Sequence, residues 1–586
     1  MRTLLAASLG LALLAPAAHA QRLSADGAAQ TWQILSDQYF DDFYLKSNPS
    51  TGTALGLHQY DTQLEKYSQD AFKAEIASLH AWEKKLDAIP SDALDAEPRA
   101  DREILLGSIR AQLVQMEVLR TWEKNPDLYA TGVTSSVFTV MERPYAPANT
   151  RLRAAIEREK KIPAVFEDAR KNLKNPPKVY TEIALQQIDG DISFFQNDVP
   201  SAFAGATDKA EQAEFAKTNA AVVDALQRYA AWLKSDLLPR SNGDFRWGAS
   251  AYSAMLANQE MVDTPLDKLL AIGMEDLHKN QAAFAEVAKE IDPNKTPEQE
   301  LADLATIHPA PKDLLNTFHQ TFDSLQAFIR EHHIITLPAQ TQPTLEETPP
   351  FMRATTQASM DPPGAFETGT TKAYFNVTLP DPKWDAARTN EYMAAFNVGT
   401  IVSTSVHEAF PGHYVQFLWQ DKFPSRTRKI IGASTYIEGW AHYCEQMMLE
   451  QGYGDATAKT PREAKLIHLG QLQDALLRDA RFVVAIRMHT GVGGAMTMEQ
   501  AEDFFVKEGY QSRPIAEVET KRGTSDALYL YYTLGKLEIL KLRADVQAKQ
   551  GASFSLQQFH DELMLQGPVP LKVARKAMMH DDSPVL

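Results

Sequence analysis

The chain of 586 residues has a single cysteine, Cys444, and therefore cannot form an internal disulfide. It has no low-complexity tract and no internal repeat that we can recognise. Basic residues are fewer than acidic ones, 59 Lys and Arg against 76 Asp and Glu, which gives a formal charge of −17. Because nucleic acid is bound by basic surfaces, this acidity argues against a nucleic-acid partner. With 44% apolar residues and no covalent cross-link, the fold must be held by a large hydrophobic core.

Long hydrophobic runs are also missing, except at the N-terminus. Leu4–Ala15 is an apolar stretch that follows Arg2, and Ala18-His19-Ala20 has the small-x-small pattern of a cleavage site. The stretch is shorter than the roughly 20 residues that a membrane-spanning helix needs. The pattern predicts a signal peptide, residues 1–20, cleaved after Ala20. We therefore expect a periplasmic or secreted protein without a membrane span, and the lack of a cysteine after the cleavage site argues against lipid attachment there.

Apolar residues in the first half of the chain recur at steps of three and four, the spacing of an amphipathic helix. Between 66 and 90 such a stripe ends at Pro90, which cannot continue a helix. Similar stripes predict core-facing helices elsewhere. They lie at 101–122, 151–172, 208–236 and 265–291.

Proline and polar residues gather at 337–350, the best candidate for a boundary in the chain. It divides the mature sequence into a helical N-terminal region, 21–340, and a C-terminal region, 341–586, that carries the motifs described below. In 373–379 apolar residues alternate with others, the pattern of a half-buried strand. Helical patterns then return. The sequence predicts a mainly α protein with a small β-sheet.

The segment HEAFPGHYVQ, residues 407–416, contains two histidines, with a glutamate directly after the first. In the common zinc-binding pattern His-Glu-x-x-His, the two histidines differ by about 40° around the helix axis and both reach one ion. Here His407 and His413 are six residues apart, which on a regular helix separates them by about 120° around the axis and about 9 Å along it. A straight helix therefore cannot bring both imidazoles onto one metal.

Pro411 and Gly412 lie between the histidines and offer two ways round this difficulty. Proline opens a helix because it lacks an N–H, and glycine adopts backbone angles that other residues resist. The extra residues could bulge out and swing His413 back under His407. Alternatively, the helix ends at Phe410 and His413 begins a new element. Spacing alone does not decide between them.

A third metal ligand is available downstream, in the segment YIEGWAHYCEQ. Its Glu438 would complete a set of two histidines and one glutamate, which with water in the fourth position is a known catalytic zinc site. We therefore expect Zn²⁺ between His407, His413 and Glu438, although imidazole and carboxylate also suit other divalent ions.

Other polar residues of these two segments have roles in such a site. Glu408, beside the first histidine, would be the general base that polarises the water. Glu445 is seven residues after Glu438 and shares its helix face, so it would orient an imidazole through the free ring N–H. His442 lies on the same face.

These motifs carry a family resemblance. HEAFPGHYVQ together with IEGWAHYCEQ resembles the bacterial family DUF885, as do NPSTGTALGLHQYDTQL (48–64), RGTSDALYLYYTLGKLEILKLR (522–543) and FHDELMLQGPVPL (559–571). The resemblance covers nearly the whole mature chain. It implies a helical, metallopeptidase-like fold of the gluzincin kind, with two lobes around a deep channel and a zinc-dependent peptidase activity.

Residue by residue, the resemblance implies that His407 and His413 are the ligands of the His-Glu-x-x-Pro-Gly-His motif. Glu408 matches the base of that motif, and Glu438 matches the glutamate of Glu-Gly-Trp.

The chain differs from many members at two positions. Tyr414 stands where they have a further histidine, which puts a role for that histidine in doubt. His442 stands where they have an apolar residue, which leaves it as an additional ligand, a hydrogen-bond partner beside the ligands or, most simply, a structural histidine.

The C-terminal stretch contains residues that could stabilise the oxyanion formed during peptide hydrolysis or bind the substrate. Tyr529 and Tyr532 are three residues apart and share a helix face, so either could donate a hydrogen bond to the oxyanion. Arg522 could pair with a substrate carboxylate through two parallel hydrogen bonds. The alternative is that both tyrosines only pack in an apolar helix. Arg481 and His489 are weaker candidates.

We therefore expect an exported, zinc-dependent hydrolase that cleaves peptides. The strand at 373–379 could bind extended peptide by backbone pairing if it lies at a sheet edge beside the metal; otherwise it is a wall of the sheet. Two further hypotheses differ in function. One is a metal-dependent amidase or esterase acting on small molecules, and the other is a protein that binds peptides without cleaving them.

Overall fold

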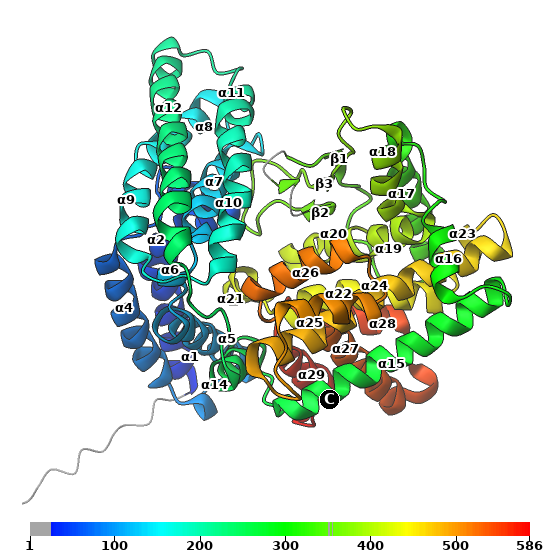
Figure 1. Ribbon diagram of the computed structural model, residues 1–586. Coiled ribbons are helices and arrows are strands. Elements are labelled where there is room, and N and C mark those ends of the chain that lie inside the picture. The colour runs from blue at the N-terminus through cyan, green and yellow to red at the C-terminus, as the bar shows by residue number, and fades with distance from the viewer. Residues whose placement is uncertain (1–24, 350–351, 354–355) are drawn as a thin grey trace, which may run out of the picture.

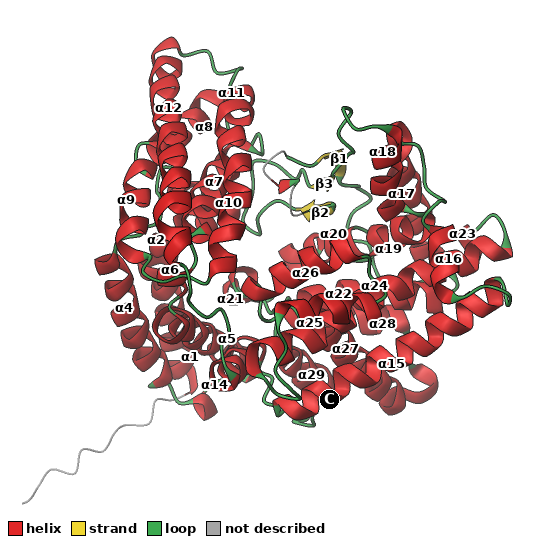
Figure 2. Ribbon diagram, in the orientation of Figure 1, coloured by secondary structure: helices red, strands yellow, loops and turns green. Residues whose placement is uncertain are grey.

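Helices form most of the protein, and one small sheet lies among them (Figure 2). The computed structural model describes residues 25–349, 352–353 and 356–586. The predicted signal peptide, residues 1–20, lies outside these residues. Within them, no helix has both the length and the apolar character needed to cross a bilayer. The prediction of a mainly α protein with a small sheet is confirmed.

The helices of the first half lie where the stripes predict them, although the stripe at 151–172 is divided between α8 (Ala148–Glu159) and α9 (Ile162–Asn172). The stripes at 66–90 and 265–291 form α4 (Gln69–Asp87) and α15 (Leu266–Ile291), and the hydroxyl of Ser68 begins α4 by accepting a hydrogen bond from the backbone N–H of Ala71. The remaining helices up to residue 331 are α1 (Ala25–Gln38), α2 (Leu45–Ser47), α3 (Pro49–Ala54), α5 (Ala96–Leu113), α6 (Thr121–Lys124), α7 (Asp127–Met141), α10 (Lys178–Ser193), α11 (Val199–Ala202), α12 (Lys209–Trp232), α13 (Leu238–Arg240), α14 (Ala249–Met255), α16 (Pro297–Leu304) and α17 (Leu314–Glu331).

The second half consists of the sheet and a further set of helices. These helices are α18 (Ala386–Met393), α19 (Val398–Glu408), α20 (His413–Leu418), α21 (Arg426–Ile430), α22 (Ser434–Glu450), α23 (Tyr453–Thr457), α24 (Pro461–Thr490), α25 (Met498–Lys507), α26 (Arg513–Ser525), α27 (Tyr531–Gln550), α28 (Leu556–Leu565) and α29 (Leu571–Met579). In Figure 1, α22, α24 and α27 lie together, while α7 to α12 stand apart on the other side of the sheet.

The hydrophobic cores do not follow the sequence division at residue 341. Phe318 and Phe322 of α17 pack against Phe375 of the sheet, and Phe322 also packs against Phe410, all in one core. Helices α7 to α12 have a separate core, in which Phe166 contacts Tyr229. The helix α17 thus packs with the C-terminal elements that carry the histidine motif.

The sheet has three strands in the order β1-β3-β2. The strand β3 (Tyr374–Val377) is central, with β1 (Thr344–Glu347) parallel and β2 (Ala358–Asp361) antiparallel to it. All four residues of β3 are buried, so the prediction of a half-buried strand was wrong. The reason is that phenylalanines of α17 cover one face, while Arg143 lies over the Tyr374 ring on the other.

Candidate metal centre

The two histidines of the motif belong to two different helices. The helix α19 ends at Glu408, and α20 begins at His413. Between them the chain turns back, and the N–H of Gly412 donates to the carbonyl oxygen of Val406 at 2.9 Å. Of the two predicted possibilities, a new element starting at His413 is therefore the one observed, with α19 ending two residues earlier than expected.

Gly412 is required by this turn because the backbone passes very close to α19. A Cβ atom at Gly412 would lie 1.8 Å from the carbonyl oxygen of His407 and 2.4 Å from that of Val406. No side chain can occupy this space. The turn is also tied to α22, because Trp440 Nε1 donates to the carbonyl oxygen of Pro411 at 2.9 Å. Both contacts fix where His413 lies relative to His407.

Glu438 reaches the histidines from α22, whose position is fixed at its start and in its middle. The carboxylate of Glu260 accepts hydrogen bonds from the backbone N–H groups of Ser434 and Thr435 at 3.1 and 3.0 Å, and so caps the first turn. One turn later, Gly439 packs against Gly535 of α27, where an added Cβ would lie 2.5 Å from the Gly535 Cα.

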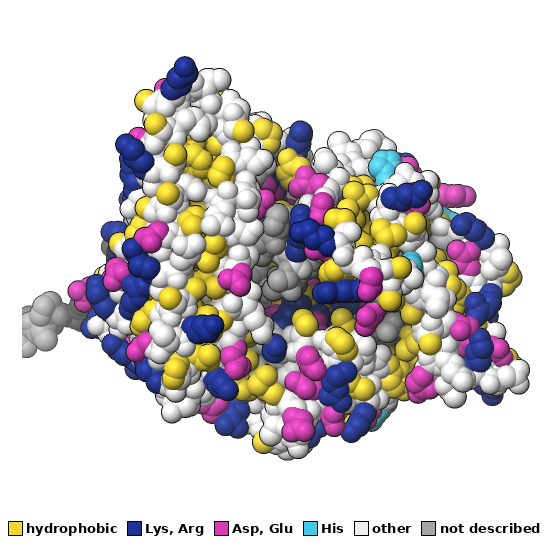
Figure 3. All heavy atoms as spheres, turned by 45° about the horizontal axis from the view of Figure 1, so that its top comes forward, with side chains coloured by type: hydrophobic (Ala, Val, Ile, Leu, Met, Phe, Trp, Pro, Cys, Tyr) yellow, Lys and Arg dark blue, Asp and Glu magenta, His cyan; other side chains and the backbone are white. Residues whose placement is uncertain are grey.

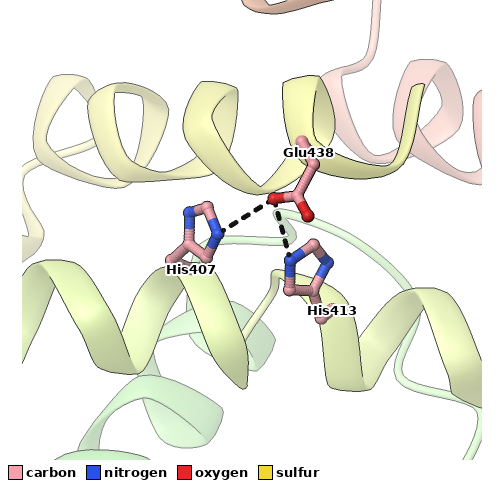
Figure 4. A group of neighbouring side chains, drawn as sticks. All are labelled: His407, His413 and Glu438. Atoms are coloured by element: carbon pink, nitrogen blue, oxygen red, sulfur yellow. Dashed lines mark ion pairs between the residues drawn. The ribbon is translucent and has the colours of Figure 1, made fainter. Parts of the chain in front are cut away.

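The three predicted ligands converge on one point (Figure 4). Glu438 Oε2 lies 3.4 Å from His407 Nε2 and 3.4 Å from His413 Nε2. The ligand atoms all lie within 4.8 Å of one another. This is the one cluster of three or more His, Cys, Asp or Glu side chains with metal-ligand spacing among the described residues.

The ring nitrogens that face away from this point are held by acceptors. His407 Nδ1 lies 2.7 Å from Glu445 Oε1, and His413 Nδ1 lies 3.0 Å from Gln416 Oε1. A proton on each Nδ1 leaves the lone pair of each Nε2 free for a metal. The predicted orienting role fits the position of Glu445.

Glu445 also joins two further side chains. Arg478 Nη2 lies 3.0 Å from its Oε1, and His442 Nδ1 lies 3.2 Å from its Oε2. His442 therefore lies behind Glu445 and outside the convergent group, and its Nε2 is buried without a partner in the described part of the chain. Of its three possible roles, this geometry fits a hydrogen-bond partner beside the ligands.

The charges of these groups are set by their mutual contacts. Burial lowers the pKa of His407, but the Glu438 and Glu445 carboxylates outweigh burial and raise it to about 9. Burial raises the pKa of Glu438, yet the two imidazoles hold it well below its usual range. The Arg478 guanidinium and His442 likewise hold the pKa of Glu445 low against burial. For His442 itself, burial dominates and lowers the pKa to about 3. Without a metal, the ionised carboxylates thus keep His407 protonated at neutral pH, and a divalent cation at the same point would displace that proton.

Glu408 faces the sheet. Its Oε2 accepts a hydrogen bond from the backbone N–H of Met360 in β2 at 3.0 Å. The strand beside the candidate centre is thus β2, which is an edge strand. Of the two roles considered for 373–379, the wall of the sheet is the one observed, because β3 lies between β1 and β2.

Tyr532 borders the centre, at the start of α27. Its ring stacks near that of His407, with centroids 6.3 Å apart, and Arg522 Nη2 donates to its hydroxyl at 3.2 Å. Burial raises the pKa of Tyr532, and the negative charge of Glu438 raises it further. The phenol is therefore held by Arg522 and is close enough to the ligand glutamate to be affected by its charge.

The other C-terminal candidates are placed differently. Tyr529 is wholly buried, with its hydroxyl against Gly523 and no hydrogen-bond partner in the described structure. Arg522 Nε and Nη2 both donate to Asp526 Oδ2. The edge of the guanidinium that could bind a substrate carboxylate is therefore already occupied by the carboxylate of Asp526. Arg481 is similarly taken by Glu519, through two hydrogen bonds of 2.7 and 2.8 Å.

His489, the remaining candidate, lies away from the convergent group. It is buried beside Phe245 and Trp247, and its Nε2 lies 2.7 Å from the carbonyl oxygen of Gly523. This is the position of a structural histidine.

Sequence reasoning missed several residues that position the ligands. Gln416 is three residues after His413, and this helical spacing could have indicated it. Arg478 and Glu260 lie in segments without a motif, and only the tertiary structure brings them to α22.

Comparison with known proteins identifies the family. Residues 49–578 match the model of the family described as "Bacterial protein of unknown function (DUF885)". The chain belongs to this family. The resemblance seen in its motifs is therefore confirmed, whereas the further likeness to gluzincins has no support in these comparisons. No curated protein matches the chain.

Two solved structures share the fold over almost their whole length. One, described as a "putative lipoprotein of unknown function" from Shewanella oneidensis, is 25% identical with a TM-score of 0.76 and covers 94% of this chain and 99% of its own. The other, a "putative lipoprotein" from Colwellia psychrerythraea, is 19% identical with a TM-score of 0.77 and covers 95% of this chain and 99% of its own. The one cysteine of the chain, Cys444, is buried.

Proposed function

We propose that this DUF885 protein is an exported, zinc-dependent hydrolase that cleaves peptides. The observation that carries the proposal is the convergence of His407, His413 and Glu438 on one point. Two ligands that are each about 2.1 Å from a tetrahedral ion lie about 3.4 Å from each other. The Glu438 oxygen lies 3.4 Å from each Nε2, which is the spacing that such an ion requires between the carboxylate and each histidine.

The donor set and its surroundings support zinc in a catalytic site. Two imidazoles and one carboxylate leave a coordination position open, as catalytic zinc sites do, whereas structural sites fill all four. When bound there, zinc would supply Lewis acidity and lower the pKa of a water molecule.

Glu408 is the residue best placed to move protons. It follows the ligand His407 directly, and Met360 of β2 holds one of its carboxylate oxygens. In the proposed reaction Glu408 accepts a proton from the attacking water as the new C–O bond forms. It then gives that proton to the leaving amine as the C–N bond breaks.

Tyr532 is the residue best placed to stabilise the developing oxyanion. Its hydroxyl oxygen accepts a hydrogen bond from Arg522, which leaves the phenol proton free to be donated. Because burial and then the charge of Glu438 raise the pKa of Tyr532, the phenol stays a donor at neutral pH. Removal of a donor of this kind typically lowers the rate by about 10²–10³.

The surface is compatible with a large substrate. Figure 3 shows a hollow in one face of the molecule, with Lys and Arg side chains beside it. This supports, as part of the proposal, a metallopeptidase-like arrangement of two lobes around a channel. An extended peptide is the substrate class that we infer for it.

The deciding experiment compares the wild type with Glu408→Gln. We expect both to bind close to one zinc per chain by elemental analysis, and the variant to lose peptide hydrolysis by at least about 10²-fold. Glu438→Ala should lose the metal itself. Equal hydrolysis by Glu408→Gln would show that the assigned base is wrong.

The substrate class is tested separately with peptides, esters and acylated amino acids. Turnover of the esters or acylated amino acids alone would favour the amidase or esterase hypothesis. Peptide binding without turnover of any compound would favour a peptide-binding protein.

A further inference from the structure

A pocket away from the metal centre lies between α15, α22, α23 and α24. Its volume is about 350 Å³, near the lower end of the roughly 300–1,000 Å³ that ligand pockets occupy. It is therefore sized for a small molecule. Its wall from α22 includes Gln446, the residue that follows Glu445, so the pocket and the metal centre share a helix.

The floor of the pocket holds amide groups whose hydrogen bonds are incomplete. Gln471 is only 5% exposed, yet its side-chain amide makes no hydrogen bond to any other described residue. Beside it, Asn280 donates to Asp479 at 2.7 Å, while its own amide oxygen accepts nothing from the described part of the chain. Buried amides are normally hydrogen-bonded, so these two groups are free to bind a molecule in the pocket.

Opposite charges line different walls of the pocket. Lys279 comes from α15, and Asp455 comes from α23. Neither forms an ion pair with another described residue, in contrast to Glu450 of the same pocket, which pairs with Arg543 at 3.0 Å. Lys465 of the same pocket pairs with Glu290, and His468 also lines it. Lys279 and Asp455 are thus the lysine and the carboxylate of the lining that have no ion-pair partner among the described residues.

Apolar side chains complete the lining. Leu449, Leu472, Ala283 and Ala464 surround the polar groups. A ligand that satisfies the whole site carries an anionic group, a cationic group and a small apolar part. Free α-amino acids and dipeptides have this combination.

We propose that this pocket binds a small zwitterion, a free amino acid or a dipeptide. The carboxylate of the ligand faces Lys279, its ammonium group faces Asp455, and the amides of Gln471 and Asn280 bond its polar atoms. This proposal is independent of catalysis at the metal centre, because none of the metal-site residues lines the pocket.

The test is calorimetric titration of the full mature protein carrying Glu408→Gln, so that turnover cannot complicate binding. The probes are L-leucine, the dipeptide Ala-Leu, N-acetyl-L-leucine and L-leucinamide. We expect leucine or the dipeptide to bind at least tenfold more tightly than the acetylated form, which lacks the ammonium group, and the amide, which lacks the carboxylate. The proposal would be overturned if neither L-leucine nor Ala-Leu bound at concentrations up to about 10 mM.

Variants locate the binding. Lys279→Met and Gln471→Leu should each weaken it at least tenfold, whereas Lys289→Met, which removes an exposed charge from the same helix outside the pocket, should leave it unchanged. Because Lys279 is on the surface, its variant remains informative even if Gln471→Leu fails to fold. Binding that survives both changes but is lost in His407→Ala would place the ligand at the metal centre and refute the assignment.

Discussion

Trp440 hydrogen-bonds through its indole N–H to the carbonyl oxygen of Pro411 at 2.9 Å. Trp440 lies two residues after the ligand Glu438, and Pro411 lies in the turn between His407 and His413. The bond therefore fixes the carboxylate helix to the turn that sets the spacing of the two imidazoles. Ligands that are already held in place bind a metal more tightly than the same ligands left free to move.

We predict that Trp440→Phe lowers zinc affinity about tenfold, because it removes this bond and leaves space beside the turn. Tyr443→Phe is the matched control, since Tyr443 is a buried aromatic of the same helix whose hydroxyl contacts His560 and Arg543 instead. Competition with a chelator measures both affinities. Equal affinities for the two variants would show that the bond to Pro411 has no role in metal binding.

The contact between Gly439 and Gly535 leads to a second prediction. In Gly439→Ala the new Cβ would lie 2.5 Å from the Gly535 Cα, so α22 and α27 must move apart. We expect a loss of about 1–3 kcal/mol in the free energy of unfolding, measured by urea denaturation. Activity should fall more than zinc affinity does, because Glu438 and Tyr532 lie on the two separated helices.

Gly205→Ala controls for the substitution itself. A Cβ at Gly205 meets nothing within 4 Å, so the change should stay within about 0.5 kcal/mol. If Gly439→Ala were equally mild, the close contact of the two helices would not constrain the site.

Features of the fold and of the site that depend on contacts local in the sequence could be predicted, whereas those that depend on contacts between distant segments could not. Local periodicity indicated helices such as α4 and α15, and the identities of His407, His413 and Glu438 indicated the ligands. The turn at Gly412 stayed ambiguous because its conformation depends on contact with the carbonyl groups of α19.

Burial of β3 and the role of Arg478 could not be predicted, because both depend on elements distant in sequence. The strand is covered by α17 and Arg143, and Arg478 approaches Glu445 from another helix. The alternation of apolar and other residues along a strand does not indicate which distant elements cover its second face. The same limit applies to Arg522, whose contacts with Asp526 and Tyr532 were not predicted.

Arg522 is the subject of a third prediction. Because its Nε and Nη2 already bond to Asp526, we expect it to act through Tyr532 and not as the receptor of a substrate carboxylate. Arg522→Gln should then lower kcat about tenfold for peptides with a free C-terminus and for amidated peptides alike. It should have little further effect in a Tyr532→Phe background. A loss confined to peptides with a free C-terminus would instead establish the carboxylate-binding role.

His58 gives a prediction about pH that does not involve the metal. Its Nε2 lies 2.9 Å from Glu367 Oε2, its Nδ1 lies 3.1 Å from Asp61 Oδ2, and its ring stacks on Tyr145. Burial lowers the pKa of His58, but the two carboxylates together raise it above its usual value. The imidazolium thus links the N-terminal helices to the segment between β2 and β3.

The sign of the effect follows from this raised pKa. The contribution of His58 to stability is fully present below the unfolded-state pKa of about 6.5 and is lost as pH rises through the higher folded-state pKa. Because the ring is partly exposed, we expect no more than about 1 kcal/mol. The urea midpoint of the wild type should therefore exceed that of His58→Gln at pH 6, and the difference should shrink by pH 9. His80→Gln, which removes an exposed histidine beside Glu117, is the control, and an equal pH dependence in both variants would show that the His58 contact contributes nothing specific.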